Sequence, residues 1–216
     1  MASIQAKDRL QFETLLNDIA TNFINLPIDQ IDAAIIEAQR RICECTGLDR
    51  SVLYQFVGAA PGRMWLSHVH NTSDGFLPEA PFEADQTFPW ILGQILQGNH
   101  VPIACIEDIP PEAELDRESF QRWGIKSSFV IPLSASETVI GALSFGKLNQ
   151  ETTWPERVVQ RLLLVAQAFT NALTRKENEK SLKILRRFES LVTDISTHFV
   201  NLPADRIDTQ IEDAQR

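Results

Sequence analysis

Residues 124–146, GIKSSFVIPLSASETVIGALSFG, contain the two most regular strand patterns of this 216-residue chain. Ser127–Leu133 and Val139–Phe145 are rich in β-branched, aromatic and other apolar residues, which favour strands. Only residues 134–138 separate them, a length typical of a hairpin loop. The stretch therefore predicts two adjacent antiparallel strands.

Two helices and a second hairpin precede these strands. Apolar residues recur at helical spacing before Pro27, which ends a first helix, and again from Asp29 to about Gly47, which predicts a second helix. Ser51–Val57 and Met64–His70 are rich in strand-forming residues and flank a short loop with two glycines. They predict a strand, a turn and a return strand.

Short helices and one long helix complete the pattern. We expect a short helix from about Phe88 to Leu96, a strand over Val101–Ile106 and another short helix over Arg117–Trp123. After Pro155 no proline or glycine occurs until beyond Asn201, so one long helix fits there. This order of elements predicts an α+β fold.

An internal repeat predicts the limits of the domain. Residues 11–40 and 187–216 align at an offset of 176 positions, and 17 of the 30 pairs are identical. Shared helix periodicity does not explain why Asn-Leu-Pro stands at both 25–27 and 201–203. We therefore expect an extension at residues 1–9, one complete domain at 10–175, a linker helix at 176–186 and the truncated start of a second domain at 187–216.

The composition excludes several classes of partner. The formal net charge is −9 and the pI about 4.9, whereas nucleic-acid binding needs concentrated positive charge. No apolar run approaches the roughly 18 to 20 residues of a membrane-spanning helix, and residues 1–10 lack the apolar stretch of a secretory signal. Three cysteines form no disulfide framework. We expect a cytoplasmic segment that neither binds nucleic acid nor inserts into a membrane.

Several stretches together resemble the GAF domain family. Residues 124–146 are similar to the two closing strands of that family. Gly47–Arg50 (GLDR) is similar to the start of its first strand, and Leu164–Phe169 (LVAQAF) to its closing helix. The resemblance covers nearly all of residues 10–175 and implies a GAF fold, which is PAS-like. Such a fold has a central antiparallel sheet of five or six strands, with the first, second and last helices on one face and short helices over a pocket on the other.

The resemblance extends to one subtype of the family. The Asn-Leu-Pro helix pair, Phe88–Trp90 (FPW) and Asp116–Phe120 (DRESF) look like the GAF domains found ahead of bacterial histidine kinases and enhancer-binding transcription activators. This implies a sensory module of a signal-transduction protein, with a small molecule in the pocket.

The implied pocket lies between the short helices and the facing strands. Cationic side chains there suit an anionic ligand, and a tryptophan stacks on a planar one. The alternative is structural: the tryptophans fill the core, Arg122 pairs with Glu118 across one turn, and the histidines line the pocket or the surface. The candidate ligand-binding residues are His68, His70, Trp90, Arg122, Trp123, Lys126 and Ser128.

No cofactor can be assigned from these residues. His68 and His70 share one face of a strand, but no third ligand has a spacing that suits a metal or haem. No cysteine precedes a histidine, the usual context for a covalent bilin, and the cyclic-nucleotide signature Asn-Lys-x-x-x-Phe-Asp-Glu has no counterpart. One branch of the family reduces free methionine sulfoxide with pocket cysteines, and here Cys105 alone is placed to face the pocket.

We therefore expect a non-catalytic sensory module that binds a small molecule of unknown identity. Apolar residues recur at steps of three and four from Leu185 to Phe199, which predicts a homodimer through the first and last helices. The ligand would bias the packing of these helices. The alternatives are a structural dimerisation spacer without a ligand and an enzyme similar to the free methionine sulfoxide reductases.

Overall fold

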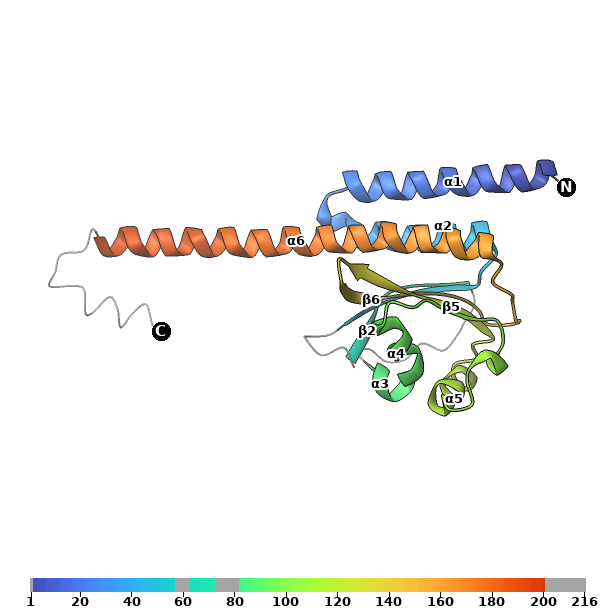
Figure 1. The fold of residues 1–216 in the computed structure, drawn as a ribbon. Helices are drawn as coiled ribbons and strands as arrows, with labels where there is room; N and C mark the ends of the chain where they lie inside the picture. Colours follow the sequence, from blue (N-terminus) through green and yellow to red (C-terminus); the bar gives the residue numbers. More distant parts are fainter. Residues whose placement is uncertain (1, 57–62, 73–81, 201–216) are drawn as a thin grey trace. The chain divides into compact units, whose positions relative to one another are not determined.

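The computed structural model describes residues 2–56, 63–72 and 82–200 (Figure 1). The chain divides into two compact units, Met1–Thr174 and Arg175–Arg216. Residues 201–216, most of the expected start of a second domain, lie outside the described residues, as do Val57, the last residue of an expected strand, and residues 58–62 of the loop expected after it. The sheet and the helices packed on it belong to the first unit.

A six-stranded antiparallel sheet forms the centre of the first unit. The strands follow the order β3-β2-β1-β6-β5-β4, and every neighbouring pair is antiparallel. The hairpin predicted from residues 124–146 is β5–β6, and the predicted α+β fold is confirmed. The strands are β1 (Arg50–Phe56), β2 (Arg63–Asn71), β3 (Phe82–Glu83), β4 (Val101–Ile103), β5 (Ser127–Ala135) and β6 (Thr138–Lys147).

The helix boundaries follow local backbone chemistry. The first helix ends two residues before Pro27, whose ring disfavours a helical residue in front of it. Gly47 ends the second helix in a left-handed conformation (φ 69°), and the N–H of Leu48 donates to the Cys43 carbonyl (3.0 Å). The helices are α1 (Ala2–Asn25), α2 (Ile31–Thr46), α3 (Ala84–Thr87), α4 (Pro89–Leu96), α5 (Glu114–Arg122) and α6 (Glu156–Val200), with 3₁₀ turns at η1 (Ile28–Gln30) and η2 (Ile106–Asp108).

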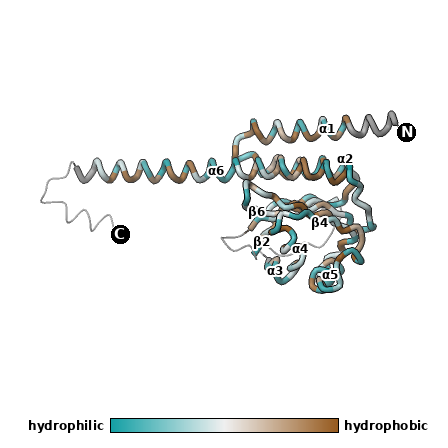
Figure 2. The backbone as a smooth tube through the Cα atoms, in the orientation of Figure 1, coloured by the Kyte–Doolittle hydropathy of each residue, from teal (hydrophilic) through white to brown (hydrophobic). Residues whose placement is uncertain are grey.

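On one side of the sheet lie α2 and the part of α6 before Arg175, as predicted, with α1 packed on the outside of these two helices (Figure 1). Figure 2 shows apolar and polar residues interspersed along these helices, and the buried ones recur every three or four positions, which places them in a stripe on one side of each helix. The stripes and the inward residues of the strands form one buried cluster. Its largest fully buried members include Phe12, Ile31, Ile35, Ile42, Leu53, Phe129, Phe145 and Phe169.

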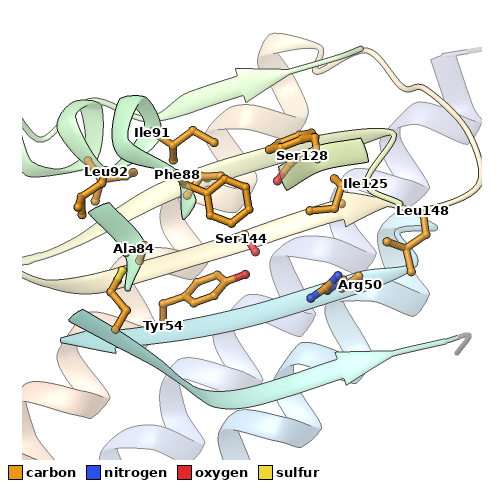
Figure 3. Close-up of a pocket in the computed structure, with 16 residues that line it drawn as sticks. Arg50, Tyr54, Ala84, Phe88, Ile91, Leu92, Ile125, Ser128, Ser144 and Leu148 are labelled. Atoms are coloured by element: carbon orange, nitrogen blue, oxygen red, sulfur yellow. The ribbon is translucent and has the colours of Figure 1, made fainter. Parts of the chain in front are cut away.

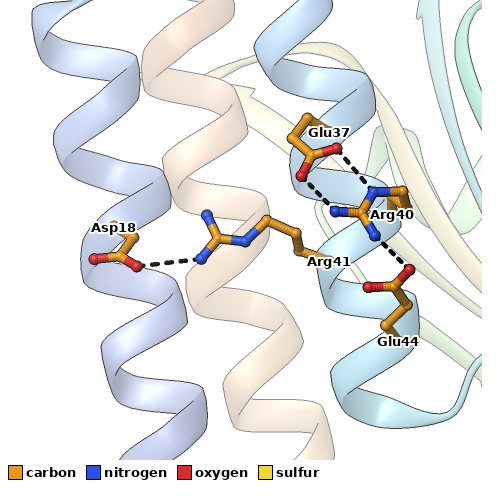
Figure 4. Close-up of polar contacts among 5 residues, drawn as sticks. All are labelled: Asp18, Glu37, Arg40, Arg41 and Glu44. Atoms are coloured by element: carbon orange, nitrogen blue, oxygen red, sulfur yellow. Dashed lines mark hydrogen bonds and ion pairs between the residues drawn. The ribbon is translucent and has the colours of Figure 1, made fainter.

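Ion pairs lie on the solvent-exposed surface of these helices (Figure 4). Arg41 on α2 reaches Asp18 on α1, with Nη2 and Oδ2 3.1 Å apart, and Arg40 pairs with Glu37 and Glu44 along α2. These side chains are between 31% and 57% exposed, so solvent screens them and their contribution to stability is small. Apolar packing therefore holds the layer together.

The other face of the sheet carries α3, α4 and α5 and a second buried cluster. Strand side chains alternate between the two faces, so β6 gives Leu143 and Phe145 to the first cluster and Ala142 to the second. The two edge strands are short, with two residues in β3 and three in β4. None of the described helices is both long enough and apolar enough to cross a membrane.

Predicted elements in the middle of the chain needed correction, among them the short helix expected over Arg117–Trp123, which spans Glu114–Arg122. The helix expected over Phe88–Leu96 begins at Pro89, and a separate turn, α3, precedes it, because Phe88 leaves the helical conformation (φ −139°). The strand expected over Val101–Ile106 ends at Ile103. Asp108 accepts hydrogen bonds from the N–H groups of Ala104 and Cys105 (2.7 and 3.2 Å), which starts a 3₁₀ turn where the strand was expected to continue.

Candidate functional site

A cavity of about 70 Å³ lies between the sheet and the α3–α5 layer (Figure 3). One buried water needs roughly 10–15 Å³, so the cavity has room for several waters or a compact organic molecule. Strands β1, β5 and β6 supply its floor. The lining residues are Arg50, Tyr54, Met64, Ala84, Phe88, Ile91, Leu92, Ile95, Phe120, Ile125, Ser128, Val130, Ala142, Ser144, Gly146 and Leu148.

Most of this lining is apolar, and the few polar groups gather at one end. In Figure 3 the guanidinium of Arg50 and the hydroxyls of Tyr54, Ser144 and Ser128 lie on the floor, away from Ile91 and Leu92. Tyr54 and Ser144 share a side-chain hydrogen bond. Burial raises the pKa of the Tyr54 phenol, an effect that the nearby positive charge of Arg50 partly offsets. The phenol therefore stays protonated at neutral pH.

Arg50 is the exceptional member of this polar group. Its side chain is only 4% exposed, and none of its three guanidinium nitrogens has a hydrogen-bond partner among the described residues. Buried arginines are almost always paired, because burial removes the water that would otherwise solvate the charge. Within the described lining it is also the only charged side chain.

Side chains of α5 hydrogen-bond to the backbone of α3 and α4, the two helices that cover the cavity with it. The buried carboxylate of Asp116 accepts hydrogen bonds from the backbone N–H groups of Trp90 and Ile91, both 3.0 Å long, in the first turn of α4. Ser119 donates to the Thr87 carbonyl (2.7 Å) at the end of α3. Burial raises the pKa of Asp116 although these N–H donors lower it. Polar contacts thus hold α3 and α4 in place above the sheet.

Replacing Asp116 with asparagine should lower the free energy of unfolding by about 1–2 kcal/mol. One of the two backbone N–H groups would then face the amide NH₂ group, which is a donor and cannot accept its hydrogen bond. Folding raises the pKa of Asp116, so the folded protein holds this proton to higher pH than the unfolded chain. The free energy of unfolding of the wild type, compared with that of Asp116→Asn, should therefore fall as the pH rises from the pKa of an ordinary aspartate through the raised pKa of Asp116. Urea unfolding at several pH values measures both effects. Glu118→Gln, an exposed change on the same helix, is the control, and an equal loss there would contradict the capping role.

Of the predicted site residues, Ser128 lines the cavity. Trp90 and Trp123 lie in the covering layer but outside the lining. Trp123 is 5% exposed and packs edge to face on Phe88, with ring centroids 4.8 Å apart. Trp123 is thus buried as in the structural alternative, whereas Trp90 is half-buried against the second cluster.

The two predicted histidines lie on the opposite face of the sheet from the cavity. His68 is paired with Leu53 of the helix-facing cluster, and its Nε2 lies 3.0 Å from Asp32 Oδ1 on α2. His70 also lies beside α2, close enough to Glu37 of that helix to act on its carboxylate. The pKa of Glu37 is lowered mainly by its hydrogen bond with Arg40, and His70 adds a smaller electrostatic effect. Their expected place in the pocket is therefore corrected, because the pleat directs both rings toward the helices.

The two predicted cations also lie outside the cavity. Arg122 is exposed in the last turn of α5. Lys126 is exposed and borders a separate hollow together with Gln121 and Glu151. The positive charge expected from these two residues comes instead from Arg50.

Sequence reasoning missed Arg50, Tyr54 and Ser144. A signal was present, because Arg50, Val52 and Tyr54 alternate along a strand whose other face carries Ser51 and Leu53. A charged residue in a strand that is apolar on both sides needs a reason to be there. The alternation does not say which face holds the pocket.

None of the three cysteines lines the cavity. Cys43 is buried in the helix layer, where burial raises the pKa of its thiol to about 12. Cys105 stands beside η2, where desolvation and then a hydrogen bond with Glu107 raise the pKa of its thiol. Within the described parts of the chain, no group of three or more histidine, cysteine, aspartate or glutamate residues could hold a metal ion.

Comparison with solved structures places this architecture. The chain is similar to the phycocyanobilin-bound GAF domain of a cyanobacterial phytochrome, with 17% identity and a TM-score of 0.63 over 78% of this chain and 96% of that one. It is also similar to the GAF domain of an Acinetobacter phosphoenolpyruvate-protein phosphotransferase (9% identity, TM-score 0.58, 76% and 93% covered). The corresponding domain from Coxiella burnetii gives 13% identity and a TM-score of 0.60 over 80% and 98%.

These likenesses show the fold, and sequence comparison shows the family. No curated protein matches the chain at a significant level. The family model for the GAF domain matches residues 30–173, from the last residue of η1 into the first part of α6. The chain therefore belongs to the GAF domain family of ligand-binding sensory modules.

Proposed function

We propose that this chain is a non-catalytic sensory module of a bacterial signal-transduction protein, a sensor histidine kinase or a transcription activator. A small molecule binds in the cavity above β1, β5 and β6, and its presence is relayed through α6 in a homodimer. The observation that carries the proposal is the cavity itself, apolar over most of its surface with polar groups at one end.

The relay is supported by the alternation of side chains in β6. Ala142 and Ser144 face the cavity, while Leu143 and Phe145, their immediate neighbours, pack in the cluster that also contains Phe169 of α6. A ligand that moves β6 would therefore change the contact surface of α6. Such a ligand biases the helices only to the extent that it binds one arrangement more tightly than the other.

Ligand binding can be tested by filling the cavity. Thermal unfolding in the presence of a metabolite library should identify compounds that raise Tm, because a ligand that binds only the folded state stabilises it by mass action. Ala142→Val adds two methyl groups to the cavity floor and should abolish the rise, whereas Ala135→Val, in β5 but outside the lining, should preserve it. No rise with any compound would support the alternative of a spacer without a ligand.

The homodimer is supported by an apolar stripe in the second unit. Leu182, Leu185, Phe188, Val192 and Ile195 follow one another at steps of three and four, and each is at least 46% exposed. Such spacing forms a seam between two helices. A strictly monomeric protein at high concentration in analytical ultracentrifugation would remove the dimer from the proposal.

The repeat suggests a second role for the same stripe. Phe188, Leu191 and Ile195 correspond to Phe12, Leu15 and Ile19, which are 2%, 8% and 2% exposed in the core of the first unit. We propose that residues 187–216 are the start of a second GAF domain and that its sheet and helices cover these positions. The stripe would then be shared between the dimer seam and the core of that domain.

The thiol enzyme is the competing function. Attack on methionine sulfoxide needs a thiolate beside the bound substrate and a resolving thiol. The raised pKa values of Cys43 and Cys105, and their positions outside the cavity lining, support a non-catalytic role. Reduction of free methionine sulfoxide by the wild type that is lost in Cys105→Ser would establish the enzyme instead.

A further inference from the structure

The unpaired guanidinium of Arg50 carries an inference about what the cavity binds. It is 4% exposed, its three nitrogens lack hydrogen-bond partners in the described structure, and it points into the cavity in Figure 3. A buried cation without a partner costs free energy, because neither water nor a counter-charge replaces its lost hydration. A position that keeps such a cation needs a partner, and the described residues do not supply one.

We propose that the cavity binds a compact organic carboxylate, which pairs with Arg50 and accepts hydrogen bonds from the hydroxyls gathered beside it. The proposal rests on the proposed function, in that the same cavity is taken to hold a small molecule. The apolar body of the ligand lies against the isoleucines and leucines of α4. Tyr54 and Ser144, which hydrogen-bond each other, and Ser128 are the hydroxyl groups at the charged end.

Charge and geometry favour a carboxylate. Arg50 is the only charged residue of the described lining, so it balances one negative charge, and a phosphate monoester brings between one and a half and two, roughly, at neutral pH. The planar guanidinium matches the two oxygens of a carboxylate through parallel hydrogen bonds. The cavity, at about 70 Å³, is modest in size, which favours a ligand with a compact apolar body.

The test compares carboxylates with their uncharged amides. The probes are acetate, 2-methylpropanoate, 4-methylpentanoate and benzoate, with acetamide, 2-methylpropanamide, 4-methylpentanamide and benzamide as isosteres and inorganic phosphate as the other anion. Tm by differential scanning fluorimetry and Kd by calorimetry are measured for the wild type, Arg50→Met, Arg50→Lys and Arg122→Met. Arg122→Met removes an exposed arginine and is the matched control.

At least one carboxylate should raise the Tm of the wild type and of Arg122→Met, while its amide and phosphate should not. Arg50→Met should weaken binding of that carboxylate by about 10- to 100-fold, the loss expected for charge-assisted hydrogen bonds. Arg50→Lys should weaken it less, because a point charge remains. Without any probe, Arg50→Met should have a Tm equal to or above that of the wild type, since it removes an unpaired buried charge.

Several outcomes would overturn the inference. If amides bind as well as carboxylates, or if Arg50→Met binds carboxylates with unchanged Kd, the cavity holds small molecules without using Arg50, and the proposed function stands alone. If Arg50→Met lowers Tm strongly without probe, the guanidinium is already paired within the fold. If no carboxylate binds, the inference fails, and the proposed function fails with it only if the metabolite library also gives no shift that Ala142→Val removes.

Discussion

Replacing Phe169 with alanine is expected to lower the free energy of unfolding by about 3–5 kcal/mol. Phe169 is fully buried in α6, and its ring meets Phe23 of α1 edge to face, with ring centroids 5.3 Å apart. Alanine removes this aromatic contact and leaves a void that the neighbouring side chains fill only in part. Chemical unfolding followed by circular dichroism measures the loss.

Leu164→Ala is the matched control on the same helix. Leu164 is 56% exposed, so its truncation should change the free energy of unfolding by no more than about 0.5 kcal/mol. A double mutant of Phe23 and Phe169 should show a coupling of about 0.5–1.5 kcal/mol. Equal losses for Phe169→Ala and Leu164→Ala would mean that α1 and α6 do not share a core.

Gly141→Ala should destabilise the fold by about 2–3 kcal/mol, a large effect for one added methyl group. A Cβ at Gly141 would lie 2.2 Å from the backbone oxygen of Tyr54, and real Cβ atoms do not approach so closely. The obstacle is the backbone of the neighbouring strand β1, so no side-chain rotation relieves the clash. Moving β1 would also displace the Tyr54 side chain in the cavity, and ligand-induced stabilisation should weaken together with stability.

Gly93→Ala gives the opposite sign and so controls for the general effect of the substitution. Gly93 lies inside α4, and a Cβ there would have no heavy atom within 4 Å other than its local neighbours. Alanine is the better helix former by up to about 1 kcal/mol, so this variant should be more stable than the wild type. If both variants lose stability equally, the close approach at Gly141 is not the cause.

The layers of the fold could be predicted because each follows from a regular local pattern. The runs of strand-forming residues in 127–145 predict β5 and β6, and the helical spacing of Phe12, Leu15, Ile19 and Phe23 predicts the stripe that α1 buries. These patterns report the type of each element and, for a helix, the side that is apolar. They require no knowledge of the partner that covers it.

The site could be predicted only in part, because it depends on which face of each strand meets which layer. Spacing correctly placed His68 and His70 on one face of β2, but apolar residues occur on both faces of this strand, so the pattern could not tell the helix side from the cavity side. The pairing register decides, and it shifts between Leu53 and Tyr54. Arg50 was overlooked for the same reason. That its buried guanidinium lacks a hydrogen-bond partner becomes visible only once the residues around it are placed.

The edges of the sheet restrict how copies of this protein can join. An open edge presents unpaired backbone groups and can template strand pairing with another chain. Here one edge strand has two residues, and the other has three with Pro102 at its centre, which has no N–H to donate. Growth by addition of strands is therefore disfavoured, and copies should meet through helices as closed complexes rather than as open-ended fibres.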